Sequence, residues 1–203
     1  MMPVSRFSFI PRAAAWAVVL GLGAGGLGGC AGAAVGGGAA IGTAAYQERG
    51  LRIVARDLAA ATKVRTNLLD AGEQYVIGVG VEVYEGRVLL TGTLPNEEMR
   101  ATAVSLTWKA EGVTDVINEI QIRETSLRNL ARDSWITAQL KSKLTFDKKI
   151  LAINYSIETV NGIVYLIGIA QNQQELDRVI AHARNLGYVR RIISHVRVKK
   201  AVS

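Results

Sequence analysis

An internal repeat with a constant spacing of 76 residues constrains the fold of this chain more than any other feature. Ala55-Arg56-Asp57 returns as Ala131-Arg132-Asp133, and residues 55–123 align with residues 131–199 without a gap. Thirteen positions are identical in this alignment. A single register over that length indicates two copies of one domain. Outside the triplet, the identical positions of the first copy are Leu68, Ile77, Glu82, Gly86, Val88, Leu90, Gly92, Asn96, Val113 and Ile117.

Each copy begins with the pattern of an amphipathic helix followed by a hairpin of two strands. The helices are predicted at residues 53–70 and 129–146. In the second copy the two strands are separated by Asn161-Gly162, a strong signal of a two-residue hairpin turn. Glu85-Gly86 stands at the same place in the first copy.

Each copy ends with a second helix and one more strand. Asn96 and Asn172 can cap the second helices, and alternating strands are predicted at residues 116–122 and 192–198. The order helix, strand, strand, helix, strand predicts the α+β class, with a three-stranded sheet that buries one face under two helices. Four glycines are expected to serve turn geometry, since glycine tolerates positive φ; they are Gly86, Gly92, Gly162 and Gly168.

The order of elements and the placement of the glycines resemble the BON domain, a small bacterial module. On that resemblance, residues 51–124 and 125–200 are two tandem αββαβ BON domains, each with a three-stranded mixed sheet packed against two helices. BON domains bind phospholipid or other envelope components, and the family implies no enzymatic activity. The shared positions are fold markers, and the chain shows no catalytic motif that we recognise. We therefore expect a binding protein without a cofactor or a metal ion.

The N-terminal 29 residues have the pattern of a secretory signal. Arg6 and Arg12 precede or border an apolar run at residues 13–22, which is short for a membrane span. The run leads to Leu27-Gly28-Gly29-Cys30, which resembles the lipobox of bacterial lipoproteins. That resemblance implies cleavage of a signal peptide at residues 1–29 and acylation of Cys30, for instance with palmitate. The alternative is a buried, unmodified cysteine.

The residue after the cysteine and the segment that follows bear on location. Ala31 stands where an aspartate would retain a Gram-negative lipoprotein at the inner membrane, so the resemblance implies an outer-membrane anchor facing the periplasm. Residues 31–45 are too rich in glycine to predict a helix. We interpret residues 30–50 as the lipidated cysteine and a flexible tether, with a membrane-inserting segment as the alternative.

One tryptophan lies off the apolar stripe of its helix. At about 100° per residue, Ile136, Leu140 and Leu144 form the stripe of helix 129–146, and Trp135 points away from it. The second copy carries a net charge of +6, against −3 for the first. Indole favours the headgroup level of a membrane, and basic residues are attracted to anionic lipid.

In the BON lipoprotein family, this helix of the second domain contacts phospholipid, and Trp135 aligns with its aromatic residue. The lipid is expected to be anionic, like phosphatidylglycerol. The predicted lipid-binding residues are Trp135, Ala138, Gln139, Ser142 and Lys143.

Other interpretations of these features remain open from the sequence. Trp135 could instead pack between the two domains or against residues 31–50, since tryptophan often anchors interfaces. The protein could then be a periplasmic scaffold that binds a protein or peptidoglycan partner. The net charge of +7 permits nucleic-acid binding. The lipobox argues against it, because it implies export from the compartment that holds the nucleic acid. His182 and His195 are expected at ordinary helix and strand positions.

Overall fold

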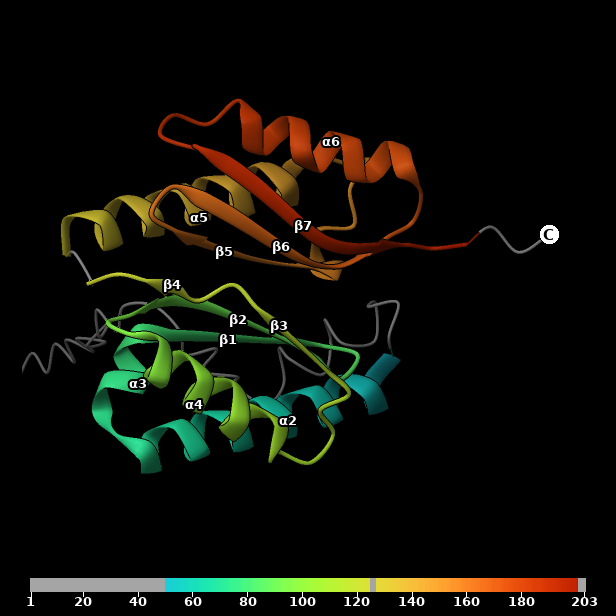
Figure 1. The fold of residues 1–203 in the computed structure, drawn as a ribbon. Helices are drawn as coiled ribbons and strands as arrows, with labels where there is room; N and C mark the ends of the chain where they lie inside the picture. The colour runs from blue at the N-terminus through green and yellow to red at the C-terminus, as the bar shows by residue number, and fades with distance from the viewer. Residues whose placement is uncertain (1–49, 125–126, 201–203) are drawn as a thin grey trace, which may run out of the picture. The chain divides into compact units, whose positions relative to one another are not determined.

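The computed structural model describes residues 50–124 and 127–200 (Figure 1). The predicted signal peptide, Cys30 and the predicted tether lie outside the described residues. What is described is α+β throughout, and the sequence repeat corresponds to two domains with the same order of elements.

The first domain has five helix or strand segments in addition to its hairpin. Its hairpin consists of β1 (Val79–Tyr84) and β2 (Arg87–Leu94), paired antiparallel. Strands β3 and β4 both pair parallel with β2, which therefore lies in the middle of the sheet. The remaining segments are α2 (Gly50–Ala71), α3 (Glu73–Gly78), α4 (Glu97–Trp108), β3 (Asp115–Asn118) and β4 (Gln121–Ile122).

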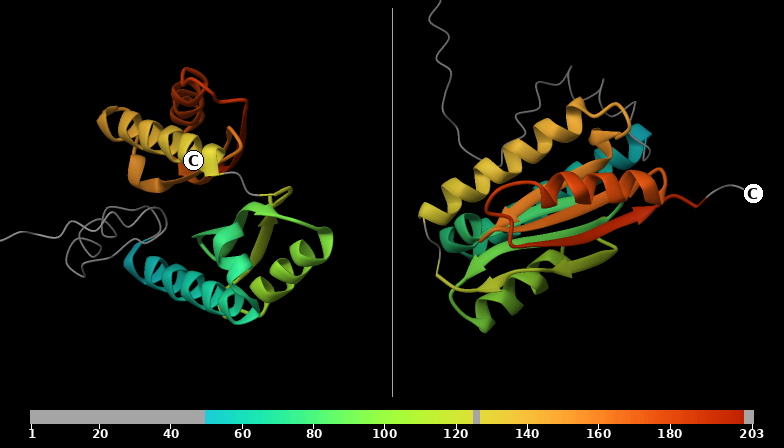
Figure 2. Two further views of the ribbon diagram at one scale, coloured as in Figure 1. Left: turned by 90° about the vertical axis from the view of Figure 1, so that its left-hand side faces the viewer. Right: turned by 90° about the horizontal axis from the view of Figure 1, so that it is seen from above.

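The second domain repeats this topology with an uninterrupted closing strand. Strand β6 pairs antiparallel with β5 and parallel with β7. Helices α5 and α6 cover one face of this sheet (Figure 2). The segments are α5 (Leu127–Phe146), a short 3-10 helix (Ala152–Asn154), β5 (Tyr155–Val160), β6 (Ile163–Ala170), α6 (Gln173–Arg184) and β7 (Arg191–Val198). The predicted three-stranded mixed sheet under two helices is confirmed.

The apolar stripes of the first helices are the centre of both cores. In α5, Ile136, Leu140 and Leu144 are at most 1% exposed. The equivalent residues of α2 are Ala60, Val64 and Leu68, and they are buried to the same degree. The predicted core face of both helices is therefore confirmed.

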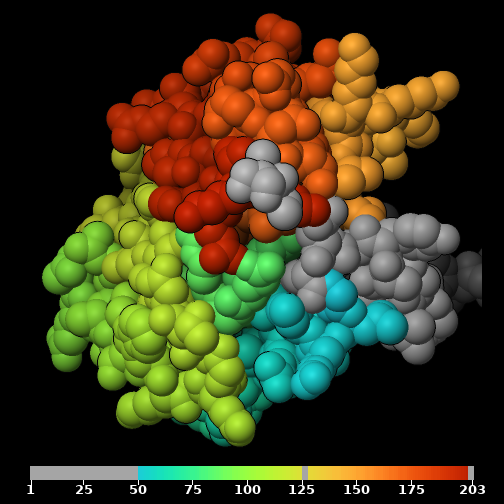
Figure 3. All heavy atoms as spheres, turned by 90° about the vertical axis from the view of Figure 1, so that its right-hand side faces the viewer, coloured from blue at the N-terminus to red at the C-terminus, as the bar shows by residue number. Residues whose placement is uncertain are grey.

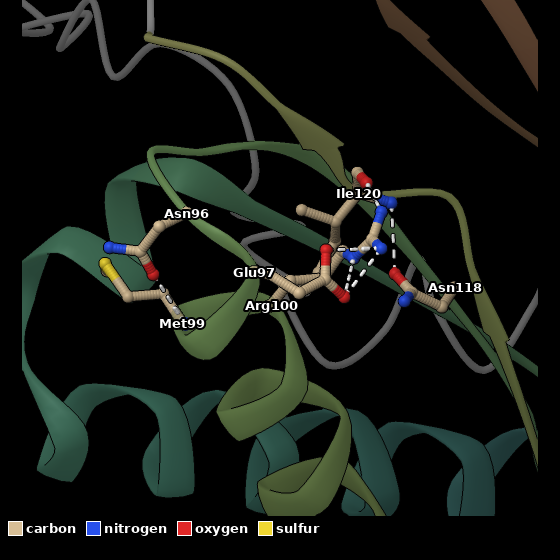
Figure 4. A network of polar contacts seen from close by, with 6 residues as sticks. All are labelled: Asn96, Glu97, Met99, Arg100, Asn118 and Ile120. Atoms are coloured by element: carbon tan, nitrogen blue, oxygen red, sulfur yellow. Dashed lines mark hydrogen bonds and ion pairs between the residues drawn. The ribbon is translucent and has the colours of Figure 1, made fainter.

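Two local features of the first domain differ from the sequence prediction. Helix α3 follows α2 where no helix was expected, and the predicted strand 116–122 is broken into β3 and β4. Arg100, on α4, donates to the carbonyl oxygen of Ile120 at the break and also pairs with Glu97 (Figure 4). Asn118 accepts a hydrogen bond from the backbone N–H of Ile120 through its side chain, which turns the chain out of the ladder.

The predicted caps of α4 and α6 are present. The side chain of Asn96 accepts from the backbone N–H of Met99, and that of Asn172 accepts from the backbone N–H of Glu175, each at 2.9 Å. Such caps satisfy a helix N–H that has no partner within the helix. Figure 4 shows the first of these caps.

A buried aspartate in each first helix holds the hairpin turn of its own domain. Asp133 accepts hydrogen bonds from the backbone N–H groups of Asn161 and Gly162, at 2.6 and 2.8 Å. Asp57 makes the equivalent bonds in the first domain. Each turn leaves the N–H groups of two residues with positive φ pointing at the helix. The repeated Ala-Arg-Asp triplet thus marks a structural contact between helix and hairpin.

Two of the four glycines predicted to lie in turns lie within strands instead. Gly86 and Gly162 occupy the hairpin turns, with φ of 74°. Gly92 and Gly168 belong to β2 and β6. A Cβ atom at Gly168 would lie 2.0 Å from the carbonyl oxygen of Asn154, so close backbone approach requires glycine there.

A third apolar cluster lies on the sheet faces opposite the helices. It consists of Tyr84 and Leu89 from the first domain with Tyr165 and Ile167 from the second, all at most 1% exposed. Successive residues of a strand point to opposite faces, which is why residues between core positions form this cluster. His195 lies beside it, with Nε2 2.9 Å from Oε1 of Glu119.

Glu82 and Glu158 occupy equivalent positions of the two copies, each paired across its hairpin with a residue of this cluster. Burial and the charge of Glu82 raise the pKa of Glu158 to about 7, although Lys141 and Arg65 act in the opposite direction. The cause is physical: a carboxylate that loses water and faces another carboxylate favours its protonated form.

Candidate functional site

The exposed face of α5 carries the tryptophan that the sequence placed away from the core. Trp135 is 46% exposed, next to the fully buried Ile136. Its ring partner belongs to its own domain. A contact with residues before Gly50 concerns a segment outside the described residues.

Trp135 is half of an aromatic pair. Its ring meets that of Tyr188 edge to face, with centroids 6.2 Å apart and an angle of 75° between the planes. The guanidinium of Arg132 lies over the ring of Tyr188, 4.9 Å from its centroid. Tyr188 is itself 65% exposed. The three side chains form an exposed aromatic and cationic group, which we call the Trp135 group.

The position of Tyr188 requires an unusual backbone conformation. Its φ is 70°, a left-handed value that costs a non-glycine residue about 1 kcal/mol. The equivalent residue of the first domain is Gly112, at φ 87°. The turn therefore demands this conformation in both copies, and only the second copy places a ring there.

The other predicted lipid-binding residues are all on the surface. Ala138, Gln139, Ser142 and Lys143 are exposed positions of α5. Ser142 and Lys143 line a shallow hollow next to the end of the helix. These residues share the exposed side of α5 with Trp135, and no contact in the structure shows them binding a ligand.

Sequence reasoning missed a second apolar side chain on this face. Phe146 is the last residue of α5 and is 83% exposed, more than any other large apolar side chain in the described part of the chain. It follows Trp135 by eleven positions, which places it within about 20° of Trp135 around the helix. The signal was available, because the same rotation that placed Trp135 outside the core also places Phe146 there.

Lysines surround Phe146, and the nearest carboxylate is already engaged. Lys143, Lys148 and Lys149 line the hollow beside it. Asp147 bonds both His182 Nε2 at 2.7 Å and Arg178 Nε at 2.6 Å. The hydrogen bond from His182, followed by that from Arg178, holds the pKa of Asp147 well below its usual range. The C-terminal end of α5 therefore presents an exposed apolar side chain next to three lysines.

The described residues contain neither a membrane-crossing helix nor a metal-binding cluster. Across residues 50–124 and 127–200, no helix is both long and apolar enough to traverse a bilayer. In the same ranges, no three His, Cys, Asp or Glu side chains gather as metal ligands would.

Comparison with known protein families matches the BON domain twice, at residues 56–124 and at residues 132–200. The chain belongs to the BON domain family. Both matches begin at the arginine of the repeated triplet, directly before the aspartate that holds the hairpin turn. The BON fold thus accounts for both copies of the repeat.

Three relatives are each similar to more than half of this chain. The chain is 41% identical to a protein of the gshII 5′ region of Anaplasma centrale, over 70% of this chain and 95% of that one. It is 34% identical to the outer membrane lipoprotein DolP of Haemophilus influenzae, over 71% and 77%. It is 37% identical to a 21 kDa hemolysin of Actinobacillus pleuropneumoniae, over 57% and 59%.

Proposed function

We propose that this protein is an outer-membrane-anchored lipoprotein that binds anionic phospholipid through α5 of its second BON domain and supports the integrity of the cell envelope. The observation that carries the proposal is the Trp135 group, an exposed aromatic pair with an arginine over one ring. The similarity to an outer membrane lipoprotein supports the location.

The chemistry of the α5 face suits the surface of a membrane. Trp135 and Phe146 lie on one side of the helix, about three turns apart, so both rings can reach the headgroup level at once. Lysines beside Phe146 can each add about 1 kcal/mol of attraction to an anionic leaflet. The helix would lie along the surface, as amphipathic helices with an apolar and a basic side do.

Liposome co-sedimentation tests this role. Both apolar cores lie within residues 60–198, so a chain of residues 31–203 keeps them and lacks only the lipid-bearing cysteine and what precedes it. We expect this chain to bind phosphatidylglycerol vesicles and to bind phosphatidylcholine vesicles weakly. Trp135→Glu should weaken binding at least about tenfold, which corresponds to about 1.4 kcal/mol.

The first domain offers a matched control. Trp108, the last residue of α4, is 51% exposed, similar to Trp135. Trp108→Glu should leave vesicle binding unchanged. If Trp135→Glu stays folded and binds as well as the parent, the lipid role of this face is wrong. Binding lost equally in both variants would also contradict it.

The anchor is tested separately in cells. We expect radiolabelled palmitate to be incorporated into the parent protein and not into Cys30→Ser. Labelling of the serine variant would place the lipid elsewhere.

A further inference from the structure

The first BON domain contains a cavity of about 1210 Å³ that the α5 face does not involve. It lies where the first half of α2, the β1–β2 turn and the connection from α4 to β3 come together. Figure 3 looks onto this part of the domain, with α2 in cyan and the other two segments in green and yellow-green. The side chains used below are Ile53, Arg56, Ala59, Lys63, Lys109 and Glu111.

The equivalent site of the second domain is much smaller. Seven residues that line a cavity of only about 50 Å³ are the repeat equivalents of residues that line the large cavity. Two of the differences between the copies replace a small residue by an aromatic one. Trp135 stands at the position of Ala59, and Tyr188 stands at the position of Gly112. The first domain therefore lacks both rings of the Trp135–Tyr188 pair, of which Tyr188 lines the small cavity.

The walls and the charges of the large cavity favour an amphipathic anion. Ile53 and Ala59 supply apolar surface, as do the stems of the lysines. Arg56, Lys63 and Lys109 bring three positive charges.

The acidic groups at this cavity are mostly engaged. Asp57 accepts from the turn N–H groups, and Glu85 pairs with Arg197. Glu111 is the acidic lining residue for which no such pairing is seen. The lining thus carries three basic and three acidic side chains, and two of the acidic ones are held by partners other than Arg56, Lys63 and Lys109.

We propose that this cavity binds a small amphipathic anion, with an aromatic ring system held where the second domain places its own rings and a negative group among the three cations. Arg132 shows how the ring is held, because it lies 4.9 Å from the centroid of Tyr188. Arg56 is its repeat equivalent and lines the cavity. A cation over a ring face contributes about 0.5–2 kcal/mol. Ligand sites of this kind are usually apolar clefts with a few placed polar groups.

The test uses 2-naphthalenesulfonate as the probe and the chain of residues 31–203 as the protein. Binding is followed through the backbone amide signals of Gly86 and Gly112, which line the cavity, in ¹⁵N-resolved NMR spectra. We expect saturable shifts at these two residues and smaller shifts at Gly162, the equivalent of Gly86 in the smaller site. Uncharged 2-naphthalenemethanol should bind at least about fivefold more weakly, since it lacks the charge that the cations recognise.

Two variants and a control decide the outcome. Ala59→Trp copies the residue of the second domain into an exposed helix position and should abolish saturable binding. Arg56→Gln should weaken binding about tenfold through loss of charge and ring contact. Leu69→Trp adds an indole to the same helix at a residue 59% exposed and outside the cavity, and should bind as the parent does.

The proposal fails if the parent shows no saturable shifts, or if Ala59→Trp and Arg56→Gln both bind as the parent does. It also fails if the shifts map to Gly162 rather than to Gly86. Because vesicles are absent from this test, its result is independent of lipid binding by α5.

Discussion

The ring of Trp135, on the first helix of the second domain, meets the ring of Tyr188, on the turn before the last strand, at a centroid distance of 6.2 Å. The contact gives the indole a ring partner while leaving 46% of Trp135 exposed. An exposed tryptophan normally loses conformational freedom when it binds a surface. We expect the contact with Tyr188 to restrict the indole before binding, which would lower the entropic cost of binding.

The first prediction concerns the fluorescence of Trp135. In the chain of residues 31–203, Trp108→Phe leaves Trp135 as the single tryptophan. We expect its emission to shift to shorter wavelength with phosphatidylglycerol vesicles, because the indole moves from water to the headgroup level. Trp135→Phe retains only Trp108 and serves as the control. A shift of the same size in both variants would count against a specific role of α5.

The second prediction concerns the aspartate that holds the hairpin turn. Asp133→Ala should lower the free energy of unfolding by about 2–4 kcal/mol, because two charge-assisted hydrogen bonds to turn N–H groups are lost. Asp177, an exposed residue of α6, provides the control, and Asp177→Ala should change it by less than about 0.5 kcal/mol. Urea unfolding measures both. Equal stability of the two variants would show that the turn is held by other contacts.

The third prediction concerns the close backbone approach at Gly168. Gly168→Ala should destabilise the protein by at least about 3 kcal/mol, since the new Cβ would meet the carbonyl oxygen of Asn154 and φ is 151°. Gly187 has no neighbouring atom within 4 Å of a built Cβ. Gly187→Ala should therefore be nearly neutral. Thermal unfolding that ranks the two variants in the opposite order would contradict this reading of the strand.

The fourth prediction concerns the pH dependence of stability. The folded-state pKa of Glu158 is raised to about 7, so the folded protein binds a proton that the unfolded chain releases at lower pH. Stability should therefore fall as the pH rises from about 4.5 to about 7 and stay reduced above that. Glu158→Gln removes this loss and should raise the free energy of unfolding by up to about 3 kcal/mol at pH values near 8.

Denaturant unfolding across this pH range checks the effect of Glu158→Gln. Glu98, an exposed residue in the first turn of α4, provides a charge-matched control. Parallel pH profiles for the parent, Glu158→Gln and Glu98→Gln would show that Glu158 does not titrate in the way we describe.

The repeat and the apolar periodicity were sufficient to predict the architecture of both domains. Asn161-Gly162 predicted the hairpin, and Ile136, Leu140 and Leu144 predicted the buried side of α5, because both signals are local and strong. The break between β3 and β4 was not predictable in this way. It depends on Arg100 reaching the carbonyl oxygen of Ile120, a contact between residues twenty positions apart.

The candidate site was predictable only in part. Helical rotation placed Trp135 outside the core, and the same argument would have found Phe146. Tyr188 could not be placed beside Trp135 from periodicity, because it lies on a turn whose path depends on the packing of α6 and β7. The alignment of the two copies does contain the clue, since Tyr188 replaces a glycine and Trp135 replaces an alanine.

Each copy carries its own core and its own aspartate binding its own hairpin turn. Neither copy uses the other's residues for these contacts. Positions away from these contacts could therefore differ between the copies, and the second copy carries Trp135 and Tyr188 where the first has Ala59 and Gly112.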